Sequence, residues 1–108
     1  MITKELRDKE IQKVLTQIVE KYHPLKVILF GSAADEAAAE VNDLDFLIIM
    51  EDVPEGGIDR LYEINSLVDR GGFAVDMLVY TPGEIDERIR MGDPFVRKMV
   101  NEGRLLYG

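Results

Sequence analysis

Three short apolar runs, and the unequal lengths of chain between them, constrain the fold of this sequence most strongly. The runs are KVILF at residues 26–30, DFLIIM at residues 45–50 and AVDMLVY at residues 74–80. Each is rich in β-branched or aromatic residues and is bounded by Gly, Pro, Asn or Asp, which is typical of β-strands. The sequence therefore predicts three strands, and the connections between them indicate their directions.

The connection between the first two runs is too short for a comfortable parallel crossover. It comprises residues 31–43, whereas a parallel crossover takes about a dozen residues or more and usually includes a full helix. We therefore expect the first two strands to be antiparallel neighbours. Residues 51–73 are longer, and within them residues 55–72 carry apolar side chains at helical spacing. A crossover helix there would make the third strand parallel to the second.

Helical patterns also flank the predicted sheet on both sides in the sequence. Residues 3–22 carry apolar side chains three and four positions apart, with Thr3 as a candidate N-cap. Residues 81–92 and 93–106 predict two more helices, in which Pro82 and Pro94 suit first helical positions and Asp93 suits a cap. No internal repeat or long linker is present. The predicted fold class is α/β (α+β), a small mixed three-stranded sheet flanked by helices, in one domain over residues 1–108.

Composition narrows the chemistry available to the chain. Cysteine is absent and His23 is the single histidine, so a protein-bound metal would have to be held by oxygen ligands. The net charge of -8 disfavours nucleic acid as the main partner, since attraction to a phosphate backbone needs clustered Lys and Arg. Neither a membrane span nor a signal peptide is indicated, so we expect a cytoplasmic protein without a membrane partner.

Three aspartates are the candidate reactive residues. Side chains alternate along a strand, so Asp43 and Asp45 share one face, and a parallel third strand places Asp76 level with Asp45. Adjacent carboxylates raise one another's pKa unless they share a cation. Oxygen ligands in an open arrangement suit Mg²⁺, which commonly completes its shell with substrate phosphates. The alternative is structural: an Asx-type turn before the second strand, and an exposed Asp76 on an edge strand.

Gly31 and Ser32 follow the first strand, where a short helix could begin. Such a turn allows close backbone approach and directs N–H groups outward, which suits a phosphate. If the first two strands are antiparallel, this turn lies beside Asp43 and Asp45. The sequence thus predicts one site for metal and polyphosphate together.

The order of these pieces resembles the minimal nucleotidyltransferase family of the polymerase-beta-like superfamily. Its signature is a Gly-Ser, then an Asp-x-Asp pair at the start of the next strand, then a third Asp on a further strand. The resemblance implies that Asp43, Asp45 and Asp76 are catalytic and hold two Mg²⁺ ions, and that Gly31 and Ser32 hold the nucleotide phosphates. It further implies transfer of AMP from ATP, with pyrophosphate leaving.

Small members of this family typically act as antitoxins of helical HEPN-type ribonucleases, some by transferring AMP to a tyrosine of the toxin. Many members carry an Arg soon after the Gly-Ser, where this chain has Ala33, Ala34 and Asp35. Another base, such as Lys26 or Arg60, would have to replace that phosphate contact. Three hypotheses follow: an active adenylylating antitoxin, a module with a decayed site that neutralises a toxin by binding, and a structural subunit without a nucleotide site.

Overall fold

The computed structural model describes residues 4–35, 43–51 and 74–108. In chain order its elements are helix α1 (Lys4–Tyr22), strand β1 (Lys26–Phe30), the 3-10 helix η1 (Gly31–Ala34), β2 (Asp43–Ile49), β3 (Ala74–Tyr80), α3 (Pro82–Arg90), α4 (Pro94–Glu102) and β4 (Arg104–Tyr107). The three predicted strands are confirmed. The predicted crossover helix at residues 55–72 and the Thr3 cap lie outside the described residues.

The described strands form one sheet with the order β3-β2-β1-β4. β1 pairs with β2 in antiparallel fashion, and β2 pairs with β3 in parallel fashion. Both directions were predicted from the lengths of the two connections. The registers place Phe30 opposite Asp45, and Asp45 level with Asp76. The C-terminal end of β1 and the N-terminal ends of β2 and β3 therefore lie at the same end of the sheet.

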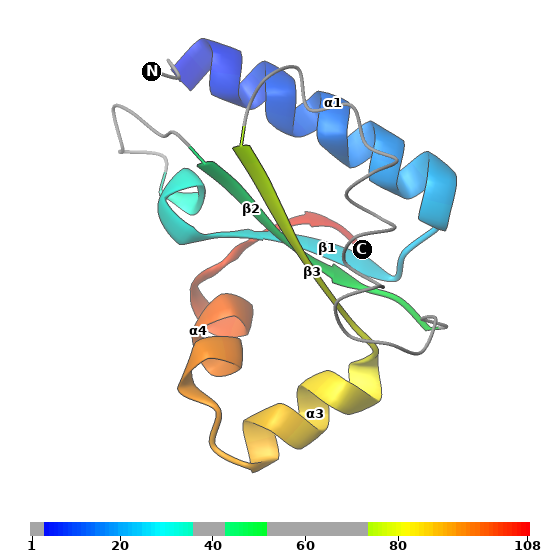
Figure 1. The fold of residues 1–108 in the computed structure, drawn as a ribbon, viewed down its shortest axis with the longest axis vertical. Helices are drawn as coiled ribbons and strands as arrows, with labels where there is room; N and C mark the ends of the chain where they lie inside the picture. The colour runs from blue at the N-terminus through cyan, green and yellow to red at the C-terminus, as the bar shows by residue number, and fades with distance from the viewer. Residues whose placement is uncertain (1–3, 36–42, 52–73) are drawn as a thin grey trace.

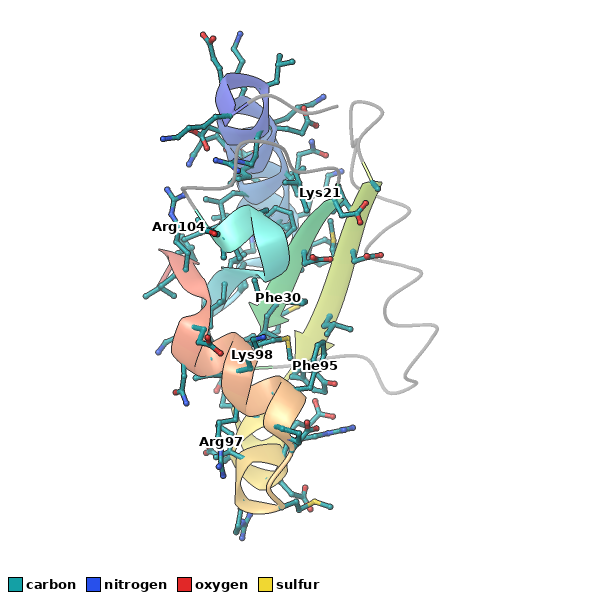
Figure 2. The ribbon with its side chains drawn as sticks, turned by 90° about the vertical axis from the view of Figure 1, so that its left-hand side faces the viewer. Lys21, Phe30, Phe95, Arg97, Lys98 and Arg104 are labelled. Atoms are coloured by element: carbon teal, nitrogen blue, oxygen red, sulfur yellow. The ribbon has the colours of Figure 1, made fainter. Side chains whose placement is uncertain are left out.

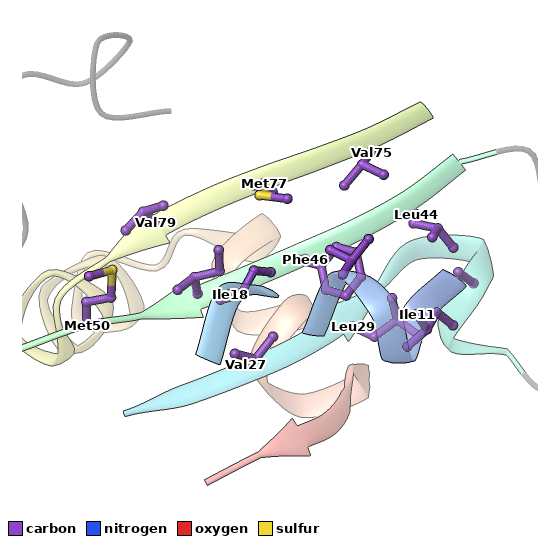
Figure 3. Packing of buried hydrophobic residues seen from close by; sticks show 13 residues of the cluster. Ile11, Ile18, Val27, Leu29, Leu44, Phe46, Met50, Val75, Met77 and Val79 are labelled. Atoms are coloured by element: carbon purple, nitrogen blue, oxygen red, sulfur yellow. The ribbon is translucent and has the colours of Figure 1, made fainter. Parts of the chain in front are cut away.

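Helices cover both faces of the sheet (Figure 1), with α1 on one face and α3 and α4 on the other. The α1 face holds the larger apolar cluster, which Figure 3 shows from close by. Its β2 members alternate along the strand, and they are Leu44, Phe46 and Ile48; Met50, directly after β2, continues the pattern. The second cluster joins Leu47 and Ile49 of β2 to Ile85 of α3 and to Val96 and Met99 of α4. Asp43 and Asp45 share this second face by alternation.

The starts of α3 and α4 follow from local hydrogen bonding. Thr81 and Glu84 form a capping box: the Glu84 N–H donates to Thr81 Oγ1 at 3.1 Å, and the Thr81 N–H donates to Glu84 Oε1 at 2.9 Å. Asp93 Oδ1 accepts from the N–H groups of Phe95 and Val96 at 3.0 and 3.3 Å. The predicted Asp93 cap is thus confirmed. The helix that it caps, α4, packs against the end of β1 through Phe95 and Phe30.

A fourth strand corrects the predicted strand number. The sequence extended the last helix to residue 106, but α4 ends at Glu102, and Arg104–Tyr107 form β4 on the free edge of β1. Glycine at position 103 permits this change of direction because it has no Cβ. A Cβ there would clash with the Met99 carbonyl oxygen and would lie 2.5 Å from Ile28 Cγ2. The run RLLY is short and mostly exposed, so its own pattern did not distinguish a strand from the end of a helix.

No helix in the described part of the chain has the length and apolar character needed to cross a membrane.

Candidate active site

Two aspartates meet across neighbouring strands at the edge where β2 and β3 begin. Asp45 and Asp76 occupy the same level of the parallel pair, and their carboxyl groups are joined by a hydrogen bond. Asp43 lies two residues earlier on the same face of β2 and is exposed. Asp45 is half-buried, whereas Asp76 is exposed. The structure therefore brings Asp45 and Asp76 together, and Asp43 lies two residues earlier on the same face of β2.

The surroundings of Asp45 oppose its ionisation. Burial, the negative charge of Asp76, the hydrogen bond to Asp76 and the charge of Asp43 together raise the pKa of Asp45 to about 6. Each cause disfavours a second negative charge at this position. A carboxyl pair with this property is relieved either by sharing a proton or by sharing a cation. Perturbed pairs of this kind cluster at functional sites.

The raised pKa predicts how the stability of the metal-free protein changes with pH. The pKa of Asp45 is about 6 in the folded state, against an ordinary value of 3.8. At pH values between these two pKa values, folding is therefore accompanied by uptake of a proton. Its contribution to the free energy of unfolding is fully present below pH 4 and is lost as the pH rises through 6. We expect Asp45→Asn to gain stability relative to the native chain as the pH rises from 4 to 8.

The measurement is thermal unfolding of both chains in EDTA across that pH range. Asp86→Asn is the matched control, since Asp86 is exposed on α3 and its removal takes away the same charge. Its profile gives the effect of removing one surface charge, against which the profile of Asp45→Asn is compared. Parallel profiles for Asp45→Asn and the native chain would contradict the assignment of a raised pKa to Asp45.

Gly31 connects β1 to η1 directly beside this pair. Its φ is +74°, and a Cβ built on it would lie 2.5 Å from Asp45 Oδ2. Glycine is required here on both counts, because an L side chain would be strained in this region and would occupy the space of the carboxylate. The main chain at residue 31 thus lies close to the Asp45 carboxylate, with no room for a side chain between them. The side chain of the other predicted phosphate-binding residue, Ser32, lies outside the described structure.

Oxygen ligands for a metal are present, but they do not form a closed cage. Within residues 4–35, 43–51 and 74–108, no group of three or more His, Cys, Asp or Glu side chains is arranged to hold an ion. Asp43, Asp45 and Asp76 thus do not form a three-ligand site by themselves, whereas Mg²⁺ is usually bound through one or two carboxylates together with substrate phosphates. Asp45 and Asp76 suit that role because their charges repel at short range and one side of the pair is open.

A cavity of about 630 Å³ borders Gly31. It is bounded by Phe30, Gly31, Ala34, Asp35, Phe95, Lys98, Met99, Glu102 and Gly103. The rings of Phe30 and Phe95 form one wall, with centroids 6.0 Å apart and planes at 89°. Figure 2 shows these two residues and Lys98 together below η1. The volume is within the usual range for small-molecule sites.

Sequence reasoning did not identify the α4 side of this cavity. Phe95, Lys98, Met99 and Glu102 recur at intervals of three and four residues, so they lie on one face of α4. That periodicity was visible, but it equally describes a face packed on a core. Only the docking of α4 beside the end of β1 shows that this face borders a cavity next to Gly31.

The geometry of two carboxylates beside a glycine turn can be compared with known proteins. The nucleotidyltransferase domain family matches residues 11–107, so the chain belongs to the nucleotidyltransferase domain family. A crystal structure of a "putative nucleotidyltransferase" from Sulfolobus solfataricus has a similar fold, with a TM-score of 0.60 and 23% identity over 78% of this chain and 75% of that chain. Comparison with curated proteins gives no match.

Proposed function

We propose that this chain is a Mg²⁺-dependent nucleotidyltransferase that transfers AMP from ATP to a hydroxyl group of a protein. The observation that carries the proposal is the Asp45 and Asp76 pair beside Gly31. Family membership supports nucleotidyl transfer in general. The donor nucleotide, the metal and the acceptor come from the resemblance described above, and they are the parts that experiment has to test.

In the proposed reaction the acceptor hydroxyl oxygen attacks the α-phosphorus of ATP, and the bond to the bridging oxygen breaks to release pyrophosphate. Asp43, Asp45 and Asp76 would hold two Mg²⁺ ions, which supply neutralisation of the charge that develops on the phosphoryl oxygens. Asp76 faces solvent and accepts the proton of the hydroxyl. By the same resemblance, Gly31 and Ser32 would hold the β and γ phosphates.

The proposed acceptor is a small helical protein of the HEPN ribonuclease type, which this chain would neutralise as an antitoxin. The support is the resemblance to small family members of this role. Met91, Phe95 and Leu105 are 77%, 54% and 53% exposed, but single exposed apolar side chains are normal on a protein surface and do not by themselves support a partner.

The test uses α-labelled ATP and a helical protein encoded beside this chain's reading frame. Label should be retained on the partner in the presence of Mg²⁺ and absent in EDTA. The same reaction with γ-labelled ATP should leave the partner unlabelled, which separates nucleotidyl transfer from phosphoryl transfer. Retention of the γ label, or no label from either nucleotide on a neutralised partner, would exclude the proposed reaction.

One observation favours a second candidate function, neutralisation by binding alone. After the Gly-Ser, Ala33 is buried in the core and the first exposed position carries the acidic Asp35, so the expected basic contact is missing from this segment. A binding module with a decayed site would neutralise its partner equally well after Asp43→Asn. An active transferase would lose neutralisation in that variant.

A further inference from the structure

Two residues connect the cavity between η1 and α4 with the carboxylates. Gly31 borders the cavity and also meets Asp45. Phe30 borders it as well and stands opposite Asp45 in the antiparallel register, where facing side chains start about 5 Å apart. A molecule that reaches from the cavity past Gly31 would therefore bring its far end to the carboxylates.

A triphosphate at this position needs a positive charge from the protein. Asp43, Asp45 and Asp76 are acidic, and Asp35 and Glu102 add two more acidic side chains at the cavity. Among the described residues that border the cavity, Lys98 carries the positive charge. Its side chain is exposed, and a lysine is a mobile point charge that suits phosphate oxygens.

The alternative bases named from the sequence are placed differently. Lys26 begins β1, whereas Phe30 ends it, so about 13 Å of strand separate Lys26 from the Gly31 turn. Lys26 stands opposite Ile49, at the far end of β2 from Asp45. Arg60 lies outside the described residues. Lys98 thus stands beside the segment from which the expected arginine is missing.

We propose that the cavity between η1 and α4 binds the donor nucleotide, with Lys98 contacting its phosphates in place of the missing arginine. The nucleoside then lies along the wall formed by Phe30 and Phe95, and Phe95 is 54% exposed. Aromatic rings accept any base by stacking, since every base has a π face. This inference rests on the proposed function, because it assigns a place to that reaction's donor.

The test is calorimetric titration with α,β-methylene-ATP and, separately, with tripolyphosphate, both with Mg²⁺. Lys98→Met keeps the length of the side chain and removes its charge. We expect it to weaken both ligands about tenfold, because a hydrogen bond to a charged group is lost. Lys98→Arg should restore both affinities. Phe95→Ala should weaken the ATP analogue about fivefold or more and leave tripolyphosphate unchanged.

Lys26→Met is the matched control, because it removes the same charge from an exposed site at the other end of β1. It should bind both ligands as the native chain does, and all variants should share the native circular dichroism spectrum. Native affinity in Lys98→Met would overturn the role of Lys98 while leaving the proposed function standing. A native chain that binds neither ligand would overturn both proposals. Equal losses in Lys98→Met and Lys26→Met would indicate a nonspecific charge effect and would also overturn the assignment.

Discussion

Asp45→Asn should reduce nucleotidyl transfer by about a thousandfold, since metal-assisted charge neutralisation contributes several kcal/mol. Asp45 is central to this expectation because it stands level with Asp76 and next to Gly31. Asparagine preserves the shape of the side chain but removes its charge. The measurement is the rate of label transfer from α-labelled ATP to the partner protein at saturating Mg²⁺.

Stability separates a catalytic effect of Asp45→Asn from damage to the fold. The raised pKa means that ionised Asp45 is unfavourable in the metal-free protein near neutral pH. The variant should therefore lose activity while its melting temperature at pH 7.5 equals or exceeds that of the native chain. Asp86→Asn should retain both properties. Transfer at the native rate by a folded Asp45→Asn protein would remove Asp45 from the proposed chemistry.

Gly31→Ala should destabilise the protein more than the same change at Gly92. Both glycines have positive φ, +74° and +82°, and an alanine in this region costs about 1–2 kcal/mol. At Gly92 no atom lies within 4 Å of the added Cβ, whereas at Gly31 it would lie 2.5 Å from Asp45 Oδ2. Gly92→Ala therefore measures backbone strain alone, and urea unfolding at pH 7 gives both free energies.

A double-mutant cycle identifies the source of the additional cost at residue 31. Asp45→Ala removes the carboxylate that the new methyl group would meet, so Gly31→Ala in that background should cost about as much as Gly92→Ala. The coupling free energy between residues 31 and 45 then reports their contact directly. Equal costs for Gly31→Ala and Gly92→Ala in the native background would mean that residue 31 and the carboxylate are not in close contact.

The sequence predicted the sheet well because strand direction depends on the lengths of the connections. A short connection favoured antiparallel β1 and β2, and a long one allowed β3 to run parallel to β2. Those two directions were enough to bring Asp45 level with Asp76 and Gly31 beside them. The alternation of apolar residues along β2 then indicated which face would carry the carboxylates.

The features that the sequence did not predict depend on tertiary packing. β4 is short and exposed, and it forms because the free edge of β1 offers hydrogen-bond partners. The cavity depends on the docking of α4, whose periodicity predicts a helix but does not state which element it packs against. Lys26 was a reasonable candidate because it is close to Gly31 in the sequence. In the structure it begins β1, whereas Gly31 follows the end of that strand, so Lys26 lies away from the site.

The register between β2 and β3 has a consequence for how such a chain can diverge. Neighbouring strands are held about 4.8 Å apart by main-chain hydrogen bonds, so the spacing of the Asp45 and Asp76 Cα atoms is set by the backbone ladder. The opposite wall of the cavity belongs to α4, which begins at Pro94, well after β3 ends at Tyr80. Substitutions on α4 can therefore alter the shape and charge of the cavity without moving the two carboxylates.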